Sequence, residues 1–329
     1  MKLASLNGGR DGGLLVVTRA LDRATPAADI APTLQCALDH WSDVVGRLSR
    51  LAEDLESRRV QGTPFDAAGC AAPLPRAFHW VDGSAYVSHI ELVRKARGAE
   101  MPPSFWTSPI IYQGGSDTFL GPRQQIPPFD EASGIDFEAE VAYVVDDTPM
   151  GCTPAEAEAR IRLVMLVNDV TLRNLVPDEL AKGFGFYVSK PSSAFSPVAV
   201  TLDELGSAWR NGKLHRPLQV HLNGRRIGAP DAGTDATFSP GQLIAYAAQT
   251  RSLGAGTIVG TGTVSNRDAS RGACCLAEVR AREMIAGGAP VTPFLRGGDR
   301  VRIEMLDEAG ASIFGAIDQT VTRRPAPGR

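Results

Sequence analysis

The chain has 329 residues, 43% of them apolar, and its 34 Lys and Arg residues nearly balance its 37 Asp and Glu residues, leaving a net charge of −3. This balance argues against a nucleic acid or an anionic membrane as partner, because both require a basic surface, and no apolar run reaches the roughly 18 residues of a membrane span. The 34 Gly and 23 Pro residues argue against a helix bundle, since both residue types destabilise helix interiors.

The N-terminal residues and the cysteines predict where the protein works. No apolar stretch followed by a small-residue cleavage site stands near the N-terminus, so we expect no signal peptide. The five cysteines are odd in number and form no C-x-x-C pair. They are therefore expected to be reduced thiols in a cytoplasmic protein.

The first part of the chain is predicted to form a small domain over residues 1–72. A β-hairpin is expected over residues 1–19, because a glycine-rich turn separates two apolar runs. Apolar residues at three- and four-residue spacing then predict one helix that begins at Thr33 and ends before Gln61. A loop rich in Ala and Pro, from Asp66 to Pro75, is typical of a domain boundary.

The second part, residues 73–329, is dominated by predicted strands. These runs cover residues 135–145, 164–170, 184–189, 198–201, 218–222, 257–264, 301–306 and 313–322. A short helix is expected at Pro154, after a capping box that starts at Thr153, and another at Pro240. Because strands outnumber helices without regular alternation, the predicted fold class is α+β and not a doubly wound parallel sheet.

Two carboxylates in the predicted strand at 135–145 point the same way. Residues two apart on a strand share a face, so Glu138 and Glu140 would lie side by side, and Asp136 would continue that face. Neighbouring carboxylates repel each other unless water or a cation neutralises them. From this segment alone, a solvated strand face and a cation site are equally supported.

A third carboxylate favours the cation site. Asp169 follows the apolar run 163–167, where an unpaired carboxylate would be costly. Taken alone, Asp169 could equally be a turn or cap residue. Carboxylates that converge from separate strands, however, form the oxygen-rich kind of site that Mg²⁺ or Ca²⁺ prefers.

Two basic residues could add reactivity. His89 opens a predicted helical segment that follows a predicted turn at 81–84, although a lone histidine is more often structural or solvated. Lys190 lies in an aromatic, glycine-rich run with no nearby charge. It is either a solvated loop residue or an electrophile directed at an oxyanion.

These residues together resemble the fumarylacetoacetate hydrolase superfamily, and in particular its fumarylacetoacetase branch. The resemblance covers nearly the whole chain. It is carried by Asp82-x6-His89, Asp136-Phe137-Glu138-Ala139-Glu140-Val141, Asn168-Asp169, Lys190, Gly262-Thr263-Val264-Ser265 and residues 294–301. The D-F-E-x-E and N-D segments are specific to the superfamily, whereas the spacing between the first aspartate and the histidine points to the branch.

The resemblance implies a fold, a cofactor and a set of site residues. The expected fold is a mixed β-sandwich roll as the catalytic domain, with a small SH3-like N-terminal domain, in a homodimer. The expected cofactor is a divalent metal, Mg²⁺ in the first place and Ca²⁺ or Mn²⁺ otherwise. The implied metal ligands are Asp82, Glu138, Glu140 and Asp169. The implied catalytic residues are His89 as general base, Lys190 as oxyanion partner and Glu278 as the group that orients the base. The implied substrate contacts are Tyr112, Arg97 and Thr263.

The implied activity is hydrolysis of a carbon–carbon bond in a β-diketo acid, first of all fumarylacetoacetate, which yields fumarate and acetoacetate in aromatic catabolism such as tyrosine degradation. The same site would also suit an acylpyruvate hydrolase, an oxaloacetate decarboxylase or a 2-keto-3-deoxy sugar acid dehydratase. A metal- or ligand-binding protein without enzymatic activity is a third possibility. His89 favours hydrolysis over the second group, and a pure binding protein would need neither His89 nor Lys190.

Overall fold

One large mixed sheet runs through both parts of the chain, of which the computed structural model describes residues 1–324. Its strand order is β4-β3-β2-β1-β12-β9-β8-β17-β5-β6, and β11 also pairs with β9. These strands are β1 (Lys2–Leu6), β2 (Gly13–Val17), β3 (Arg23–Pro26), β4 (Thr63–Pro64), β5 (Trp80–Gly83), β6 (Ile111–Gly114), β8 (Ala139–Val145), β9 (Ile161–Asn168), β11 (Ala194–Phe195), β12 (Ala199–Val200) and β17 (Ile258–Gly260). Only the β17–β5 pair is parallel among the pairs within this sheet.

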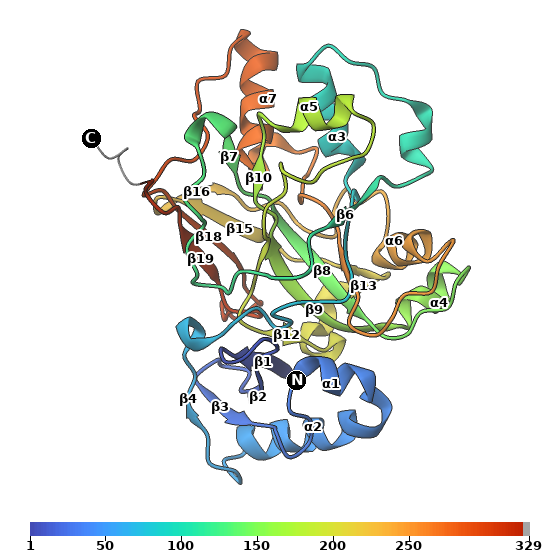
Figure 1. The fold of residues 1–329 in the computed structure, drawn as a ribbon, viewed down its shortest axis with the longest axis vertical. Coiled ribbons are helices and arrows are strands. Elements are labelled where there is room, and N and C mark those ends of the chain that lie inside the picture. Colours follow the sequence, from blue (N-terminus) through green and yellow to red (C-terminus); the bar gives the residue numbers. More distant parts are fainter. Residues whose placement is uncertain (325–329) are drawn as a thin grey trace.

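Three smaller sheets, seven α-helices and five short 3₁₀ segments complete the elements of residues 1–324. The smaller sheets are β7 (Ile135–Asp136) with β10 (Thr171–Leu172), β13 (Trp209–Arg210) with β14 (Lys213–Leu214), and β16 (Arg225–Gly228), β15 (Leu218–Leu222), β18 (Arg300–Met305) and β19 (Ile317–Thr320). The helices are α1 (Leu34–Asp39), α2 (Trp41–Glu56), α3 (Val87–Ala96), α4 (Pro154–Glu158), α5 (Val176–Ala181), α6 (Pro240–Ala247) and α7 (Leu276–Gly287). Figure 1 shows α1 and α2 at one end of the molecule and α3, α5 and α7 at the opposite end.

Both faces of the large sheet are buried. On β8, Val144 belongs to an apolar cluster that includes Leu48 of α2, whereas Val141 belongs to a second cluster that includes Ile303 of β18. The alternation follows from the two-residue period of a strand. The N-terminal helices therefore cover one face of the sheet and the four-stranded sheet covers the other, which confirms the predicted α+β class with layered sheets.

The N-terminal part contains the predicted hairpin, β1 and β2, but its helix is divided. His40 has φ −127° and ψ 33°, which is not helical, and it separates α1 from α2. Leu34 of α1 and Leu48 of α2 nevertheless pack into the same apolar cluster. The apolar spacing in the sequence therefore continues across the break between the two helices. Since β1 pairs with β12, these strands extend the main sheet. The domain limit at residue 72 and the SH3-like form stay predictions.

Several predicted elements of the second part differ in the structure. The predicted turn at 81–84 is mostly strand β5, because tertiary pairing with β17 and β6 on both sides overrides the local Gly-Ser signal. The predicted strand at 135–145 is interrupted at 137–138, between β7 and β8. The helices at Pro154 and Pro240 are confirmed, each with a capping box.

The predicted strand at 184–189 is a loop. Glu179 accepts hydrogen bonds from the backbone N–H groups of Tyr187, Val188 and Ser189, so a single carboxylate bends this segment. Those hydrogen bonds hold the pKa of Glu179 at about 2, against the opposite effect of burial. The aromatic run that suggested a strand is therefore at the surface, and Phe184 is fully exposed.

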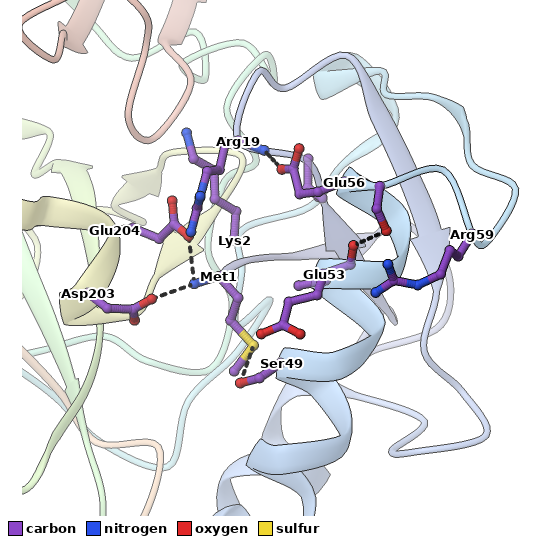
Figure 2. Close-up of a pocket in the computed structure, with 12 residues that line it drawn as sticks. Met1, Lys2, Arg19, Ser49, Glu53, Glu56, Arg59, Asp203 and Glu204 are labelled. Carbon is purple, nitrogen blue, oxygen red and sulfur yellow. Dashed lines mark hydrogen bonds and ion pairs between the residues drawn. The ribbon is translucent and has the colours of Figure 1, made fainter.

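A pocket lies at the junction between α2 and the 3₁₀ segment Leu202–Ala208, and it has a volume of about 540 Å³ (Figure 2). Acidic and basic side chains line it and pair with each other, as Arg19 does with Glu204 at 3.1 Å. The walls of this pocket therefore come from segments that lie far apart in the sequence. No helix among residues 1–324 combines the length and the apolarity that crossing a membrane would require.

Candidate active site

Three carboxylates meet at one end of the large sheet. Asp82 lies on β5, Glu140 lies at the start of β8, and Asp169 follows the last residue of β9. Strand β8 is antiparallel to both β9 and β17, and β17 is parallel to β5. The end of β5, the start of β8 and the end of β9 therefore lie at the same edge of the sheet. One oxygen from each carboxylate lies within 4.8 Å of one from each of the others, and all three side chains are buried.

Glycine at position 260 makes this close approach possible. Gly260 lies on β17, opposite Ala142 of β8 on one side and Asp82 of β5 on the other, and a Cβ atom at this position would come within 2.2 Å of Asp82 Oδ1. The following loop then returns to the same oxygen, since the backbone N–H of Gly262 donates to Asp82 Oδ1 at 3.0 Å. Gly260 and Gly262 therefore position this carboxylate.

Glu140 is the clearest sign that a cation belongs among these groups. Both of its carboxylate oxygens are buried and neither has a hydrogen-bond partner among residues 1–324. Burial and then the neighbouring Asp82 raise the pKa of Glu140 well above its ordinary value. A buried carboxylate without a donor is costly, and a hard divalent cation held by oxygen ligands would remove that cost. The residues present therefore fit a divalent metal.

Glu138 lies beside this cluster but has different partners. Lys190 Nζ donates to Glu138 Oε2 and to Asp169 Oδ2, each at 2.5 Å, and Arg173 Nη2 donates to Glu138 Oε1 at 2.7 Å. Burial alone would raise the pKa of Glu138, but the charges of Arg173 and Lys190 hold it well below its ordinary value. Glu138 is therefore ionised and acts in this structure as the anchor of two buried cations.

His89 on α3 forms a pair with Glu278 on α7. The His89 Nδ1 to Glu278 Oε2 distance is 3.0 Å, and Ser265 and Arg282 donate to the other carboxylate oxygen. Burial raises the pKa of Glu278, but its hydrogen bond to His89 and the charges around it lower it below the ordinary value overall. The carboxylate is thus ionised and accepts from Nδ1–H, which leaves Nε2 of His89 as the ring atom able to take up a proton.

Asp136 connects this pair to the basic side of the site. Its carboxylate accepts from the backbone N–H groups of Leu276 and Ala277 at 2.8 and 2.9 Å, at the start of α7, and from Arg173 Nε at 2.8 Å. The helix start, which carries Glu278, and Arg173 are therefore held by the same group. Asp136 was expected to continue the face of the other carboxylates, but its oxygens are bound to these donors.

The side chains surround one cavity of about 200 Å³. Lys190, His89, Tyr112 and Thr263 line it, and Tyr112 donates its hydroxyl proton to Asp169 Oδ2 at 2.7 Å. Arg97, an implied substrate contact, is exposed at the C-cap of α3 and is not among the lining residues. The guanidinium that lines the cavity belongs to Arg173.

Sequence reasoning missed Arg173 and the helix α7. Arg173 stands four residues after Asp169. If the chain turns back after β9, a residue at this distance can reach the same site, and this spacing could have identified Arg173 as a candidate. The sequence of α7 does not separate into an apolar face and a charged face, since the charged residue Glu278 is buried together with apolar residues. Its start is signalled only by a cysteine N-cap and by the distant Asp136.

The metal-free protein is expected to lose stability between about pH 4 and pH 8. Burial, then the charge of Asp169, raises the pKa of Asp82 to about 8, and Glu140 is shifted in the same direction. Groups whose folded pKa is raised stabilise the protein fully below their unfolded pKa, about 4, and lose that effect as the pH rises to the folded pKa. Urea unfolding at pH 5 and pH 8, with and without Mg²⁺, measures this.

In that experiment, saturating Mg²⁺ should remove most of the loss, since the cation takes the place of the protons. Glu138 does not interfere, because its lowered pKa places its titration below this pH window. Metal-free protein that is as stable at pH 8 as at pH 5 would contradict the expectation.

Two family models match the chain. The model described as fumarylacetoacetate (FAA) hydrolase C-terminal matches residues 79–322, and the model described as fumarylacetoacetase N-terminal domain 2 matches residues 1–76. Among known proteins, the oxaloacetate tautomerase YisK of Bacillus subtilis (strain 168) is 25% identical over 235 residues, which cover 70% of this chain and 68% of the relative.

Two solved structures have a similar fold over almost the entire chain. A putative HpcE protein from Mycobacterium smegmatis superposes with a TM-score of 0.68 at 20% identity, covering 98% of this chain and 99% of that one. A maleylpyruvate hydrolase from Sphingobium sp. SYK-6, in complex with manganese(II) and pyruvate, gives 0.64 at 14% identity, covering 98% and 99%. At these identities the likeness is one of fold.

Proposed function

The chain belongs to the fumarylacetoacetate hydrolase family, and we propose that it is a metal-dependent hydrolase that cleaves a carbon–carbon bond in a β-diketo acid. Fumarylacetoacetate is the first substrate to test, because the Asp82–His89 spacing resembles the fumarylacetoacetase branch. The observation that carries the proposal is the unpartnered, buried carboxylate of Glu140 beside Asp82 and Asp169, in a cavity that His89, the partner of Glu278, also lines.

Asp82, Glu140 and Asp169 would hold the divalent metal, with Glu138 next to them. When bound, the metal supplies positive charge that polarises the keto oxygens and stabilises an enolate. Mg²⁺ is the first candidate, and the manganese(II) and pyruvate in a protein of similar fold support a divalent ion near a keto acid.

His89 is the proposed general base. Its Nε2 takes a proton from a water molecule, and the hydroxide oxygen forms a bond to the distal carbonyl carbon. The bond between that carbon and the central carbon then breaks, and its electron pair leaves as an enolate. The proton on Nε2 returns to the enolate carbon and restores the neutral imidazole. General-base catalysis of this kind contributes about 10²- to 10⁴-fold to the rate.

The other residues position groups for this sequence. Glu278 keeps the proton of the resting imidazole on Nδ1 and stabilises the imidazolium. Lys190 lines the cavity, and the positive charge of its ammonium group would stabilise an enolate oxygen, an effect that becomes stronger as charge develops. Tyr112 and Thr263 are the proposed contacts of the substrate carboxylate.

A second reaction deserves the same test, because the oxaloacetate tautomerase among the relatives transfers protons without breaking a carbon–carbon bond. Proton transfer next to a keto group would use His89 and the metal carboxylates but no attacking water. Decarboxylation and dehydration of keto acids likewise pass through an enolate.

A substrate panel with added Mg²⁺ or Mn²⁺ separates these reactions. Fumarylacetoacetate, acylpyruvates, oxaloacetate and 2-keto-3-deoxy acids are each incubated with the protein, and the products are identified by mass spectrometry and NMR. Release of two acids from a diketo acid supports hydrolysis. Turnover limited to oxaloacetate or to the keto-deoxy acids would overturn it.

A further inference from the structure

We infer that the protein has a second metal site, formed by His89, Cys275 and Glu278, which binds Zn²⁺ and thereby inhibits the enzyme. This site does not include the three carboxylates proposed to hold the catalytic metal. The inhibition rests on the proposed function, because it acts through the proposed general base. The binding of zinc itself depends on no activity.

The three ligands of this site come together from two helices. His89 lies on α3, Glu278 lies on α7, and Cys275 is the N-cap residue of α7. One ligand atom of each residue lies within 4.8 Å of those of the other two, and Cys275 and Glu278 are fully buried. Ligands at about 2.0–2.3 Å from a tetrahedral zinc ion stand about 3.3–3.8 Å apart, so small shifts of the side chains are sufficient to enclose the ion.

The donor atoms distinguish this group from the carboxylate cluster. Nitrogen, sulfur and oxygen together form a mixed set that Zn²⁺ accepts readily, whereas Asp82, Glu140 and Asp169 offer only oxygen and suit Mg²⁺ or Mn²⁺. The two sites should therefore select different metals from the same solution. One thiolate and one carboxylate also neutralise the charge of a zinc ion, which favours its burial.

Neighbouring groups hold the ligands in place. The backbone N–H of Glu278 donates to Cys275 Sγ at 3.4 Å, and both Ser265 and Arg282 donate to Glu278 Oε1. The other oxygen, Oε2, faces His89 Nδ1 and is available to a metal. Contacts of this kind orient metal ligands and increase affinity. Burial raises the pKa of Cys275 well above its ordinary value, so its thiol is neutral without metal and gives up its proton when zinc binds.

Zinc at this site would remove the proposed base. Without zinc, Nδ1 of His89 carries the ring proton, and Nε2 has the lone pair that accepts a proton from water. Zinc that bonds to Nδ1 displaces its proton, which moves to Nε2, and the neutral imidazole then has no lone pair left for water. The thiol proton of Cys275 goes to the solvent.

Cobalt(II) tests the binding directly, because a cobalt–thiolate bond gives a charge-transfer band in the near ultraviolet and carboxylate ligands do not. We expect the Mg²⁺-loaded protein to show this band. Cys275→Ser should lose it, since a serine can still cap α7 but supplies no thiolate. Cys274→Ser is the matched control, because Cys274 is equally buried but lies outside the ligand group, and this variant should keep the band.

Zinc inhibition tests the consequence for catalysis. In excess Mg²⁺, added Zn²⁺ should inhibit cleavage of the best diketo acid, and Cys275→Ser should retain its zinc-free activity. Loss of a group that only supports a metal ligand lowers affinity about 10- to 100-fold, so loss of the Cys275 ligand should weaken the inhibition at least as much. If Cys275→Ser does not fold, His89→Ala replaces it in the cobalt titration, where weaker binding of cobalt is expected.

The outcomes separate the inference from the proposed function. If no diketo acid is cleaved but the cobalt band appears and depends on Cys275, hydrolysis fails and the second metal site stands. Absence of the band from the unmodified protein, or its survival in Cys275→Ser, overturns the inference even if hydrolysis is confirmed. Zinc inhibition of equal strength in Cys275→Ser would assign zinc to the carboxylate cluster and overturns the inference as well.

Discussion

Replacing Glu140 by glutamine is expected to abolish metal-dependent activity and, at the same time, to make the metal-free protein more stable. Both carboxylate oxygens of Glu140 are buried without a donor, next to Asp82 and Asp169. At a pH at which Glu140 is ionised, a glutamine removes one negative charge and brings an amide N–H₂ that can donate to a neighbouring carboxylate. The free energy of unfolding of the metal-free protein should therefore rise. In proteins of about 150–250 residues, each kcal/mol gained raises the melting temperature by about 2–4 °C.

The same variant should lose the stabilisation that metal gives to the unmodified protein. A ligand at 100 times its dissociation constant stabilises the folded state by about 2.7 kcal/mol. Differential scanning calorimetry with and without Mg²⁺, together with isothermal titration of the metal, measures both changes. Retention of the full metal-induced rise in melting temperature would show that Glu140 is not a ligand.

Glu138→Gln provides a contrast of opposite sign. This carboxylate is paired with Lys190 and Arg173, so its loss leaves two buried cations with fewer partners. Breaking a buried ion pair costs about 3–5 kcal/mol, and the metal-free Glu138→Gln protein should be clearly less stable than the unmodified one. Glu53→Gln, at the distant pocket of Figure 2, is the neutral control for loss of one carboxylate.

The opposite behaviour of these two glutamates marks the limit of prediction from sequence. The two-residue spacing of Glu138 and Glu140 predicted one shared strand face, and Asp169 was expected nearby from its place after an apolar run. The structure brings Glu140 and Asp169 together, but the strand is interrupted at 137–138, and Glu138 is bound to basic groups. A period of two identifies a face only while the strand is continuous.

The partners of the site come from segments that no local pattern connects. Arg173 reaches Glu138 and Asp136 after the chain turns back from β9, and Glu278 reaches His89 from 189 residues further along the chain. Strand β5, which carries Asp82, has a sequence typical of a turn and is extended only because strands pair with it on both sides. Local propensity is weak compared with such tertiary pairing.

The apolar pattern was informative where a face is buried throughout. Strands β15 and β18 were predicted to within a residue, because their alternating side chains pack against one core. The loop around Phe186 was misread as a strand because aromatic residues and glycines resemble a strand when the hydrogen bonds of Glu179 are unknown. That loop carries Phe186, which lines the cavity of the candidate site, so this part of the cavity wall could not be predicted from the sequence.

His89→Ala is expected to lower the rate constant for hydrolysis by about 10²- to 10⁴-fold, because the proposed general base is lost. Metal binding should remain intact, because the proposed ligands are the three carboxylates Asp82, Glu140 and Asp169. The measurements are kcat on the best diketo acid of the panel and the metal-induced rise in melting temperature.

Glu278→Gln should lower kcat by a smaller factor, because the imidazole remains but Nδ1–H loses its carboxylate partner. Exogenous imidazole is expected to restore part of the activity of His89→Ala and none of that lost in Glu140→Gln. Full activity of His89→Ala with normal metal binding would instead assign the base to another group, and it would favour an enolate reaction without an attacking water.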